Sequence, residues 1–585
     1  MKMFGKIIDI SDNTVFVENL TGQLQYQLKG IHVAFPEKTT TVIGKIIEIK
    51  KDMIQIYIVG EIIDGKFIMG IFKAPTLTVA PRIVTGEELV TFIGNQNYHA
   101  TNTLLIGDST TYDNFKVTAD MNNFFSNHFA IIGNSGYGKS CGVARIIQNV
   151  FETHQFAPVN AHIIMFDVYG EYHKALANLE KIPGIHVKNY INSRDNMANS
   201  IALPAFFLDA DDLAILLNVD DPYLIPILEK TLEFVRIFKS DDPASLDYKN
   251  NIIANSLLDV LASGKSAAQI RDQFLSILAK YNTPTLNVSS EIREPGYTRT
   301  LKQCLNIDNQ GKINALTLVT DFLNQFKRVN LQDYSFVPNL VYSLEDIYDA
   351  LEFALLSEGV YNSVNMYERA MSLKVHLHQI INSPNRNFFN FTQPISKKEY
   401  VEGLFKMPSF ENAQIVNVGL NSVDDRFAKI LTKLYSKLFF DYATNLEQRG
   451  SFPINIILEE AHRYVNKDKD EEIIGYNIFD RITKEGRKYG IVMGFITQRP
   501  SELSETALSQ CSNFLVFRIF HPDDYDIIDA ITSSVTRDEL ERLKTLRRGM
   551  ALAFGSAFHI PMIAKLNMPS PPPASENVDI VNTWF

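Results

Sequence analysis

The spacing of apolar residues changes along the chain, and its first part shows the short alternation that is typical of β-strands. NTVFVENL, TTTVIGKIIEI and MIQIYIVGEII alternate apolar and polar positions within the first 95 residues. A period of two places every second side chain on one face of a sheet. Asp64-Gly65 separates two apolar runs and is a strong signal for a hairpin turn. We therefore expect residues 1–95 to form a small N-terminal β-barrel.

Between residues 96 and 204 the pattern changes to strands that alternate with helices. The apolar run FAII predicts a buried strand, and HIIMFDV predicts a second one. The first strand is followed by apolar residues at helical spacing, which are Val143, Ile146, Ile147 and Val150. This part of the chain is therefore predicted to begin an α/β domain with a largely parallel sheet.

Residues 205–400 are predicted to be mainly helical. On one segment of this block, apolar residues recur at helical spacing as Ile270, Phe274, Ile277 and Leu278. Because such a long helical block interrupts the βα repeat, we interpret it as an inserted helical bundle. The α/β pattern returns over residues 401–568 with AQIVNVGL and INIILEEAH, and a Pro-rich tail follows at residues 569–585.

The segment GNSGYGKS, which follows the first predicted α/β strand, has the spacing of a phosphate-binding loop, G-x-x-x-x-G-K-[ST]. Its glycines allow the backbone N–H groups and the following helix N-terminus to approach an anion closely. Lys139 adds a charge near the β and γ phosphates, and the Ser140 hydroxyl can bind Mg²⁺. The predicted nucleotide contacts are Gly133, Asn134, Ser135, Gly136, Tyr137, Gly138, Lys139, Ser140 and Cys141. A chance glycine-rich turn is the alternative, but a strand before the motif and a helix after it favour the nucleotide site.

Acidic residues end two of the predicted strands. Glu459 and Glu460 follow an apolar strand, and we assign Glu459 to Mg²⁺ and Glu460 to the activation of water, because consecutive side chains point in different directions. The alternative is that both are exposed acids at the start of a helix. Asp167 and Glu171 follow an earlier strand, at the end where α/β sheets bind ligands. A solvated acidic turn remains an equal alternative for that pair.

A second group of candidates surrounds the strand that ends in Thr497. The amide of Gln498 can hydrogen-bond the γ-phosphate in one state and water in another, so we expect it to act as a switch. Arg481, Arg487 and Arg499 are candidates for an arginine finger that acts on a neighbouring subunit. For each of them, a solvated surface cation remains the alternative.

Composition limits the partners and the compartment. A net charge of −11 with a pI of about 5.6 excludes a surface that is basic throughout, so nucleic acid would bind in a local basic channel. The three cysteines lack metal-ligand spacing, which favours a reduced, cytoplasmic compartment. The sequence has no apolar run of membrane-spanning length, and we expect no membrane contact.

The chain resembles the HerA family of hexameric DNA translocases. The resemblance is carried, in order, by the phosphate-binding loop and by FDVYGEY, IILEEAHRY, KEGRKYGI, TQRPSEL and FLVFRIFHPDD. It implies an α/β fold with a RecA-like P-loop ATPase core, the N-terminal barrel and the inserted bundle. Glu459 departs from the pattern, because many relatives carry Asp at this position, and the longer side chain changes the geometry of metal binding.

The resemblance also implies a homo-hexamer with ATP and Mg²⁺ at the subunit borders and double-stranded DNA in its centre. By this resemblance Lys139 and Ser140 bind nucleotide, Glu460 activates water, Gln498 senses hydrolysis and Arg487 is the finger from a neighbouring subunit. The barrel would dock a partner nuclease or a sirtuin-like NAD-hydrolysing effector, in DNA end processing or in defence against phage.

Two functions stay open at this point. One is an ATP-driven DNA translocase, and the other is an ATPase ring that assembles and regulates an effector with little movement along DNA. Unrelated P-loop enzymes are disfavoured. A GTPase needs N-K-x-D, whereas NKDKD has Lys469 at the acidic position, and the LSGGQ-like signature of ABC ATPases is absent from the sequence.

Overall fold

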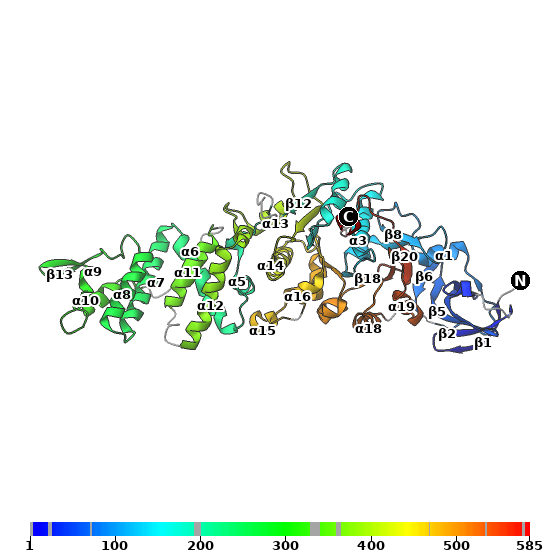
Figure 1. Cartoon of the computed structure of the whole chain (residues 1–585), viewed down its shortest axis with the longest axis horizontal. Helices are drawn as coiled ribbons and strands as arrows, with labels where there is room; N and C mark the ends of the chain where they lie inside the picture. Colours follow the sequence, from blue (N-terminus) through cyan, green and yellow to red (C-terminus); the bar gives the residue numbers. More distant parts are fainter. Residues whose placement is uncertain are drawn as a thin grey trace. The chain divides into compact units, whose positions relative to one another are not determined.

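The chain folds into two compact units. The computed structural model describes residues 4–21, 26–70, 73–191, 200–327, 340–357, 364–466, 468–532, 535–575 and 580–584. The first unit comprises residues 1–199, 400–468 and 477–585, and the second comprises residues 200–399 and 469–476. Figure 1 shows the first unit as sheets with flanking helices and the second unit as mostly helical, in green.

Seven strands near the N-terminus form an antiparallel sheet in the order β1-β2-β5-β4-β3-β7, with β6 paired to β5. Alternate residues such as Val15 and Val17 are buried, as the two-residue period predicts. The predicted hairpin turn is confirmed, because Asp64 and Gly65 both have positive φ between β5 and β6. The described pairings run in an open order, and closure into a barrel stays a prediction. The strands are β1 (Phe4–Ser11), β2 (Thr14–Asn19), β3 (His32–Pro36), β4 (Thr40–Ile49), β5 (Met53–Ile63), β6 (Lys66–Met69) and β7 (Arg82–Ile83).

Eleven strands of the described residues form the central sheet, in the order β12-β15-β11-β16-β17-β10-β18-β19-β20-β8-β9. From β12 to β18 neighbouring strands are parallel, and from β18 to β9 they are antiparallel. The carboxyl ends of β11, β16, β17 and β10 therefore meet at one edge of the sheet. The strands are β8 (Thr103–Ser109), β9 (Lys116–Asp120), β10 (Phe129–Ile132), β11 (Ile163–Asp167), β12 (Val187–Ile191), β15 (Ile415–Gly419), β16 (Ile454–Leu458), β17 (Ile491–Thr497), β18 (Asn513–Val516), β19 (Met550–Gly555) and β20 (Met562–Lys565).

Helices pack against the central sheet through apolar faces. The faces of α3 and of the sheet share one core, in which Val143, Ile147 and Val150 contribute from the helix as their spacing predicts. In α14, the Asp424 side chain caps the helix by accepting a hydrogen bond from Phe427 N. The helices of this unit are α1 (Gly86–Ile93), α2 (Met121–Phe125), α3 (Lys139–Glu152), α4 (Tyr172–Ala177), α14 (Asp425–Thr444), α16 (Ile478–Glu485), α17 (Glu505–Ser509), α18 (Pro522–Ile531), α19 (Arg537–Leu543) and α20 (Ile580–Trp584).

The larger part of the second unit, residues 200–399, is inserted between β12 and β15, which are neighbours in the central sheet. Its smaller part, residues 469–476, follows β16. On α8 the residues Ile270, Phe274, Ile277 and Leu278 are all buried, in agreement with their helical spacing. The unit contains α5 (Ala210–Leu217), α6 (Ile225–Lys239), α7 (Pro243–Ala262), α8 (Ala267–Lys280), α9 (Leu301–Cys304), α10 (Leu316–Asn324), α11 (Leu344–Ser357), α12 (Val364–Ile381), α15 (Asp470–Ile474) and the hairpin β13 (Glu291–Glu294) and β14 (Tyr297–Thr300). Helix α13 (Lys397–Leu404) lies where the chain returns to the first unit. Within the described ranges, no helix combines the length and the apolar character needed to cross a bilayer.

Candidate nucleotide site

The phosphate-binding loop connects the end of β10 to the start of α3. Gly136 has φ +82° and Gly138 has φ +97°, a region that favours glycine. The loop is tied to the adjacent strand ends, because Gly133 N donates to Thr497 O at 3.1 Å and Asn134 N donates to Arg518 O at 3.0 Å. A Cβ at Gly136 would meet no atom within 4 Å, so the loop faces open space at this residue. The loop thus has the backbone geometry to surround an anion.

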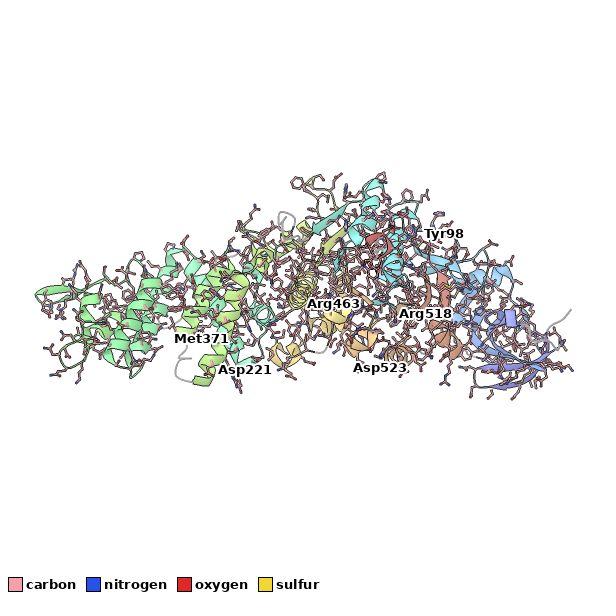
Figure 2. All side chains as sticks on the ribbon, in the orientation of Figure 1. Tyr98, Asp221, Met371, Arg463, Arg518 and Asp523 are labelled. Carbon is pink, nitrogen blue, oxygen red and sulfur yellow. The ribbon has the colours of Figure 1, made fainter. Side chains whose placement is uncertain are left out.

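Aromatic and cationic side chains support the loop from one side. Arg518, labelled in Figure 2, lies over the rings of Tyr137 and Phe520 with its guanidinium carbon 5.0 Å and 4.5 Å from their centroids. Arg518 Nη1 also donates to the Tyr137 hydroxyl at 3.3 Å. These cation–π contacts restrain the Tyr137 side chain, which does not line the cavity described below.

Lys139 and Glu460 come together from distant parts of the sequence. Lys139 Nζ lies 3.1 Å from Glu460 Oε1, and both side chains are buried. Glu460 follows β16 and has φ +47°, a left-handed conformation that is uncommon for residues with a side chain. Within the described part of the chain, its Oε2 is buried and makes no hydrogen bond, and His462 Nδ1 lies 3.3 Å away. A strained residue with an unsatisfied buried oxygen is typical of a functional site.

Glu459 is held in place by the loop that follows β11. Its Oε2 accepts a hydrogen bond from Val168 N at 3.0 Å. Burial, and then the nearby Asp167 carboxylate, raise the pKa of Glu459 well above its usual range. Asp167 accepts hydrogen bonds from Glu171 N at 3.0 Å and Tyr172 N at 2.9 Å, so it shapes this loop. Of the two acids at the end of β11, Glu171 lines the cavity and Asp167 does not.

Gln498 links the end of β17 to the phosphate-binding loop. Ser135 Oγ donates a hydrogen bond to Gln498 Oε1. His462, two residues after Glu460, lies with Nδ1 3.1 Å from Thr497 Oγ1 and 3.3 Å from Glu460 Oε2. Burial lowers the pKa of His462, while the Glu460 carboxylate opposes this shift. The histidine therefore connects the ends of β16 and β17, a role that sequence reasoning missed although it lies within the motif EEAHRY.

These groups surround a cavity of about 240 Å³. Six of the nine loop residues that were predicted to contact nucleotide line it, whereas Gly133, Asn134 and Tyr137 do not. Sequence reasoning did not find Tyr169, Arg548 or Ser575, which also line it. The full lining is Ser135, Gly136, Gly138, Lys139, Ser140, Cys141, Tyr169, Glu171, Glu459, Glu460, Gln498, Arg548 and Ser575.

The donor set of this cavity fits a nucleotide with Mg²⁺. The open face of the loop and Lys139 suit the phosphates, and the Ser140 hydroxyl and the Glu459 carboxylate suit the metal. No group of three His, Cys, Asp or Glu residues among those described is arranged to hold a metal ion without the nucleotide. In nucleotide sites, Mg²⁺ is commonly bound by one or two carboxylates together with substrate phosphates.

Arg487 lies outside this cavity. It belongs to the short helix η9 (Gly486–Tyr489), which precedes β17, and its side chain is exposed. Its charge acts on His128, which precedes β10. Because β17 follows η9 directly and His128 lies just before β10, Arg487 is near the amino ends of the parallel strands, at the edge of the sheet opposite the nucleotide cavity. Arg487 therefore does not belong to the nucleotide cavity of its own chain.

The parallel strands, the phosphate-binding loop and the facing carboxylates define a P-loop ATPase. Residues 104–439 match the family model for the central domain of the helicase HerA. The chain belongs to the HerA helicase family.

Two curated relatives and one solved structure match most of the chain. The DNA double-strand break repair helicase HerA of Pyrococcus furiosus is 22% identical over 472 residues, which cover 79% of this chain and 69% of that protein. The probable DNA double-strand break repair helicase HerA of Methanocaldococcus jannaschii is 20% identical over 577 residues, which cover 94% of this chain and 97% of that protein. Among solved structures, VirB4 of Thermoanaerobacter pseudethanolicus aligns at 11% identity and a TM-score of 0.41, covering 79% of this chain and 96% of that chain.

Proposed function

We propose that the chain is an ATP-driven translocase of double-stranded DNA that works as a homo-hexameric ring. The observation that carries the proposal is the 3.1 Å contact between Lys139 Nζ and Glu460 Oε1, because it brings the phosphate-binding lysine and the candidate base to one cavity. Membership of the HerA family, with relatives named as DNA double-strand break repair helicases, supports DNA as the substrate.

In this proposal the residues of the cavity have separate roles in ATP hydrolysis. Lys139 and the loop N–H groups hold the phosphates, and Ser140 and Glu459 hold Mg²⁺, which neutralises phosphate charge when bound. A phosphate group competes with the Glu460 carboxylate for Lys139, so nucleotide binding frees Glu460 to orient water and to accept its proton. The Oε2 of Glu460, which makes no hydrogen bond and lies 3.3 Å from His462 Nδ1, supports this role.

The hydrogen bond between Ser135 and Gln498 can couple the state of the bound nucleotide to the position of β17. Both residues line the nucleotide cavity, and both also line a second cavity of about 460 Å³. A γ-phosphate that accepts a hydrogen bond from the Gln498 amide would change the hydrogen bond between Gln498 and Ser135. The end of β17 would then move with Gln498. We therefore assign Gln498 as the sensor of hydrolysis.

The second cavity also supports catalysis at a subunit border. It contains Arg499, which pairs with Glu502 at 2.6 Å, and the carboxylate of Asp524 beside Gln498, and Asp524 can guide a cation from a neighbouring subunit towards the γ-phosphate side. We assign that cation to Arg487 of the adjacent copy, because Arg487 is exposed and distant from its own cavity. This assignment requires a closed ring, for which we propose six subunits.

The N-terminal sheet is proposed as the docking site of a partner nuclease or a sirtuin-like NAD-hydrolysing effector. Ile8, Ile68, Met69 and Leu77 expose between 42% and 60% of their surface in this region, and exposed apolar side chains favour protein contacts. With such a partner, the ring would serve DNA end processing or defence against phage.

The proposal is tested by measuring ATP turnover with and without linear double-stranded DNA, together with displacement of a triplex-forming strand. The expected result is turnover that rises with DNA and displacement that needs ATP. Lys139→Ala should lower turnover by about a hundredfold or more while the ring stays assembled. Turnover without any displacement would favour the regulatory ring, and unchanged turnover in Lys139→Ala would overturn the nucleotide site.

A further inference from the structure

A turn near the C-terminus is fixed to the phosphate-binding loop and carries an arginine into the nucleotide cavity. Gly549 N donates to Tyr137 O at 3.0 Å, and Met550 N donates to Arg547 O at 3.1 Å. The two backbones pack so closely that a Cβ at Gly138 would lie 3.2 Å from Gly549 N. The position of Arg548 relative to the loop is therefore set by backbone contacts.

The side chain of Arg548 is available for an anion. It lines the cavity near Cys141, where its charge opposes the rise in the pKa of that thiol that burial causes. Arg548 is exposed, as Arg547 is, and among the described residues its side chain has no ion pair or hydrogen bond. An exposed guanidinium that lines a phosphate-binding cavity and has no carboxylate partner can pair with a phosphate.

The last Pro-rich segment also belongs to this cavity. We name residues Ser570–Ser575 the C-terminal clasp. Gln148, on α3, accepts a hydrogen bond from Ser570 N at 3.0 Å and donates one to Pro571 O at 3.1 Å. Ala574 N donates to Glu171 O at 2.8 Å. These bonds hold the clasp across the helix that begins at Lys139, and they bring Ser575 to the cavity wall.

The direction of a phosphate-binding loop indicates what these residues would contact. Its lysine reaches the β and γ phosphates, and its N–H groups surround the α and β phosphates. Arg548 is near Cys141, two residues beyond Lys139 along the loop and helix. We propose that Arg548 binds the α-phosphate and that Ser575, held by the C-terminal clasp, contacts the ribose. This inference rests on the proposed function, because it assigns more of the same nucleotide site.

The role of Arg548 is tested by the affinity for MgATP, measured by calorimetry on the full chain. Arg548→Ala is expected to raise the Kd about tenfold, as the loss of one charge-assisted hydrogen bond predicts. The matched control is Arg547→Ala, which removes an exposed neighbouring cation that does not line the cavity and should leave the Kd unchanged. Equal affinities for the two variants would overturn the assignment.

The clasp is tested with two truncated chains and two probes, MgATP and magnesium tripolyphosphate. A chain that ends at Met568 lacks the clasp and should bind ATP about tenfold more weakly with unchanged affinity for tripolyphosphate, because only ATP has a ribose. A chain that ends at Ser575 keeps the clasp and should bind both probes as the full chain does. The assignment fails if the two truncated chains bind ATP equally.

A point variant of the full chain shows whether weaker ATP binding by the shorter chain could result from a folding defect. In the full chain, Ala574→Pro removes the N–H that donates to Glu171 O and should also weaken ATP binding, while Ala574→Ser keeps that N–H and should not. Equal ATP affinity in these two variants would contradict the clasp. Lys139→Ala separates this inference from the proposed function, because it should lose both probes. If Lys139→Ala retains both, the nucleotide site itself is wrong, whatever Arg548 and the clasp do.

Discussion

The amine of Lys139 lies 3.1 Å from a carboxylate oxygen of Glu460, although 321 residues separate them in the sequence. Both side chains are more than 90% buried, so each charge depends on the other for compensation. The strand order of the central sheet makes this contact possible, because β10 and β16 flank β17 and end at the same edge of the sheet. The residues proposed to bind phosphate and to activate water are thereby brought together in one cavity.

Glu460→Gln is expected to bind MgATP and to lose turnover by about a hundredfold or more, because the amide cannot accept the proton of water. Binding is measured by calorimetry and turnover by phosphate release. The matched control is Glu447→Gln, at an exposed position outside the cavity, which should keep full turnover. Turnover at the unsubstituted rate in Glu460→Gln would assign the base to another residue.

Gln498→Leu and Ser135→Ala test the sensor. Each removes one partner of the same hydrogen bond, and each should lower DNA-stimulated turnover by up to about tenfold while ATP affinity changes little. Because the two residues act through one bond, the double variant should be no worse than the more damaging single one. Additive losses would show that the two residues act independently.

Arg487 is tested by mixing subunits. Arg487→Ala alone and Glu460→Gln alone should each lose turnover, and mixed rings should recover part of it at borders where an intact Arg487 meets an intact Glu460. Phosphate release is measured across mixing ratios. Lys488→Ala, which removes the adjacent exposed cation, serves as the control and should remain active without mixing. Absence of recovery at every ratio counts against Arg487.

The parts of the site that could be predicted from sequence are those that local patterns encode. An apolar run predicts a strand, and the polar residue that ends it falls at the ligand-binding edge, so Glu459, Glu460 and Gln498 could be located without coordinates. The phosphate-binding loop was found in the same way, through its glycine spacing.

The remaining residues depend on packing between distant segments. Arg548 enters the cavity because Gly549 packs on Gly138, and Ser575 enters because Gln148 binds the clasp. Neither contact leaves a local pattern in the sequence. The left-handed conformation of Glu460 is similarly hidden, because the sequence has no glycine or asparagine there to indicate it.

Lys45→Met should destabilise the N-terminal sheet. Lys45, on β4, pairs with Glu539 of α19, and the two side chains are 16% and 6% exposed. Removal of the amine leaves a buried carboxylate without its cation, at a cost of about 3 kcal/mol. Faster hydrogen exchange in β3 and β4 would report the loss. Lys50→Met is the control, because its pair with Glu48 is nearly half exposed, and exchange equal to that of Lys45→Met would contradict the prediction.

His128 is expected to make stability depend on pH. Burial, and then the charge of Arg487, lower the pKa of His128 to about 4, and its Nδ1 accepts a hydrogen bond from Met493 N at 2.9 Å. Well above pH 6.5 the imidazole is neutral in both the folded and the unfolded chain. As the pH falls from about 6.5 towards 4, the unfolded chain binds a proton that the folded chain refuses, so the free energy of unfolding decreases by up to about 3 kcal/mol.

His128→Asn removes this titration and keeps an acceptor near the position of Nδ1. Between pH 7.5 and pH 5.0 the thermal midpoint of the variant should fall less than that of the unsubstituted protein, as followed by near-ultraviolet circular dichroism. His173→Asn, at an exposed histidine, should keep the original dependence on pH. Apart from the substituted histidines, all groups titrate alike in the three proteins, so the difference in slope between His128→Asn and the unsubstituted protein reports on His128. Parallel curves for these two proteins would show that burial does not hold this imidazole neutral.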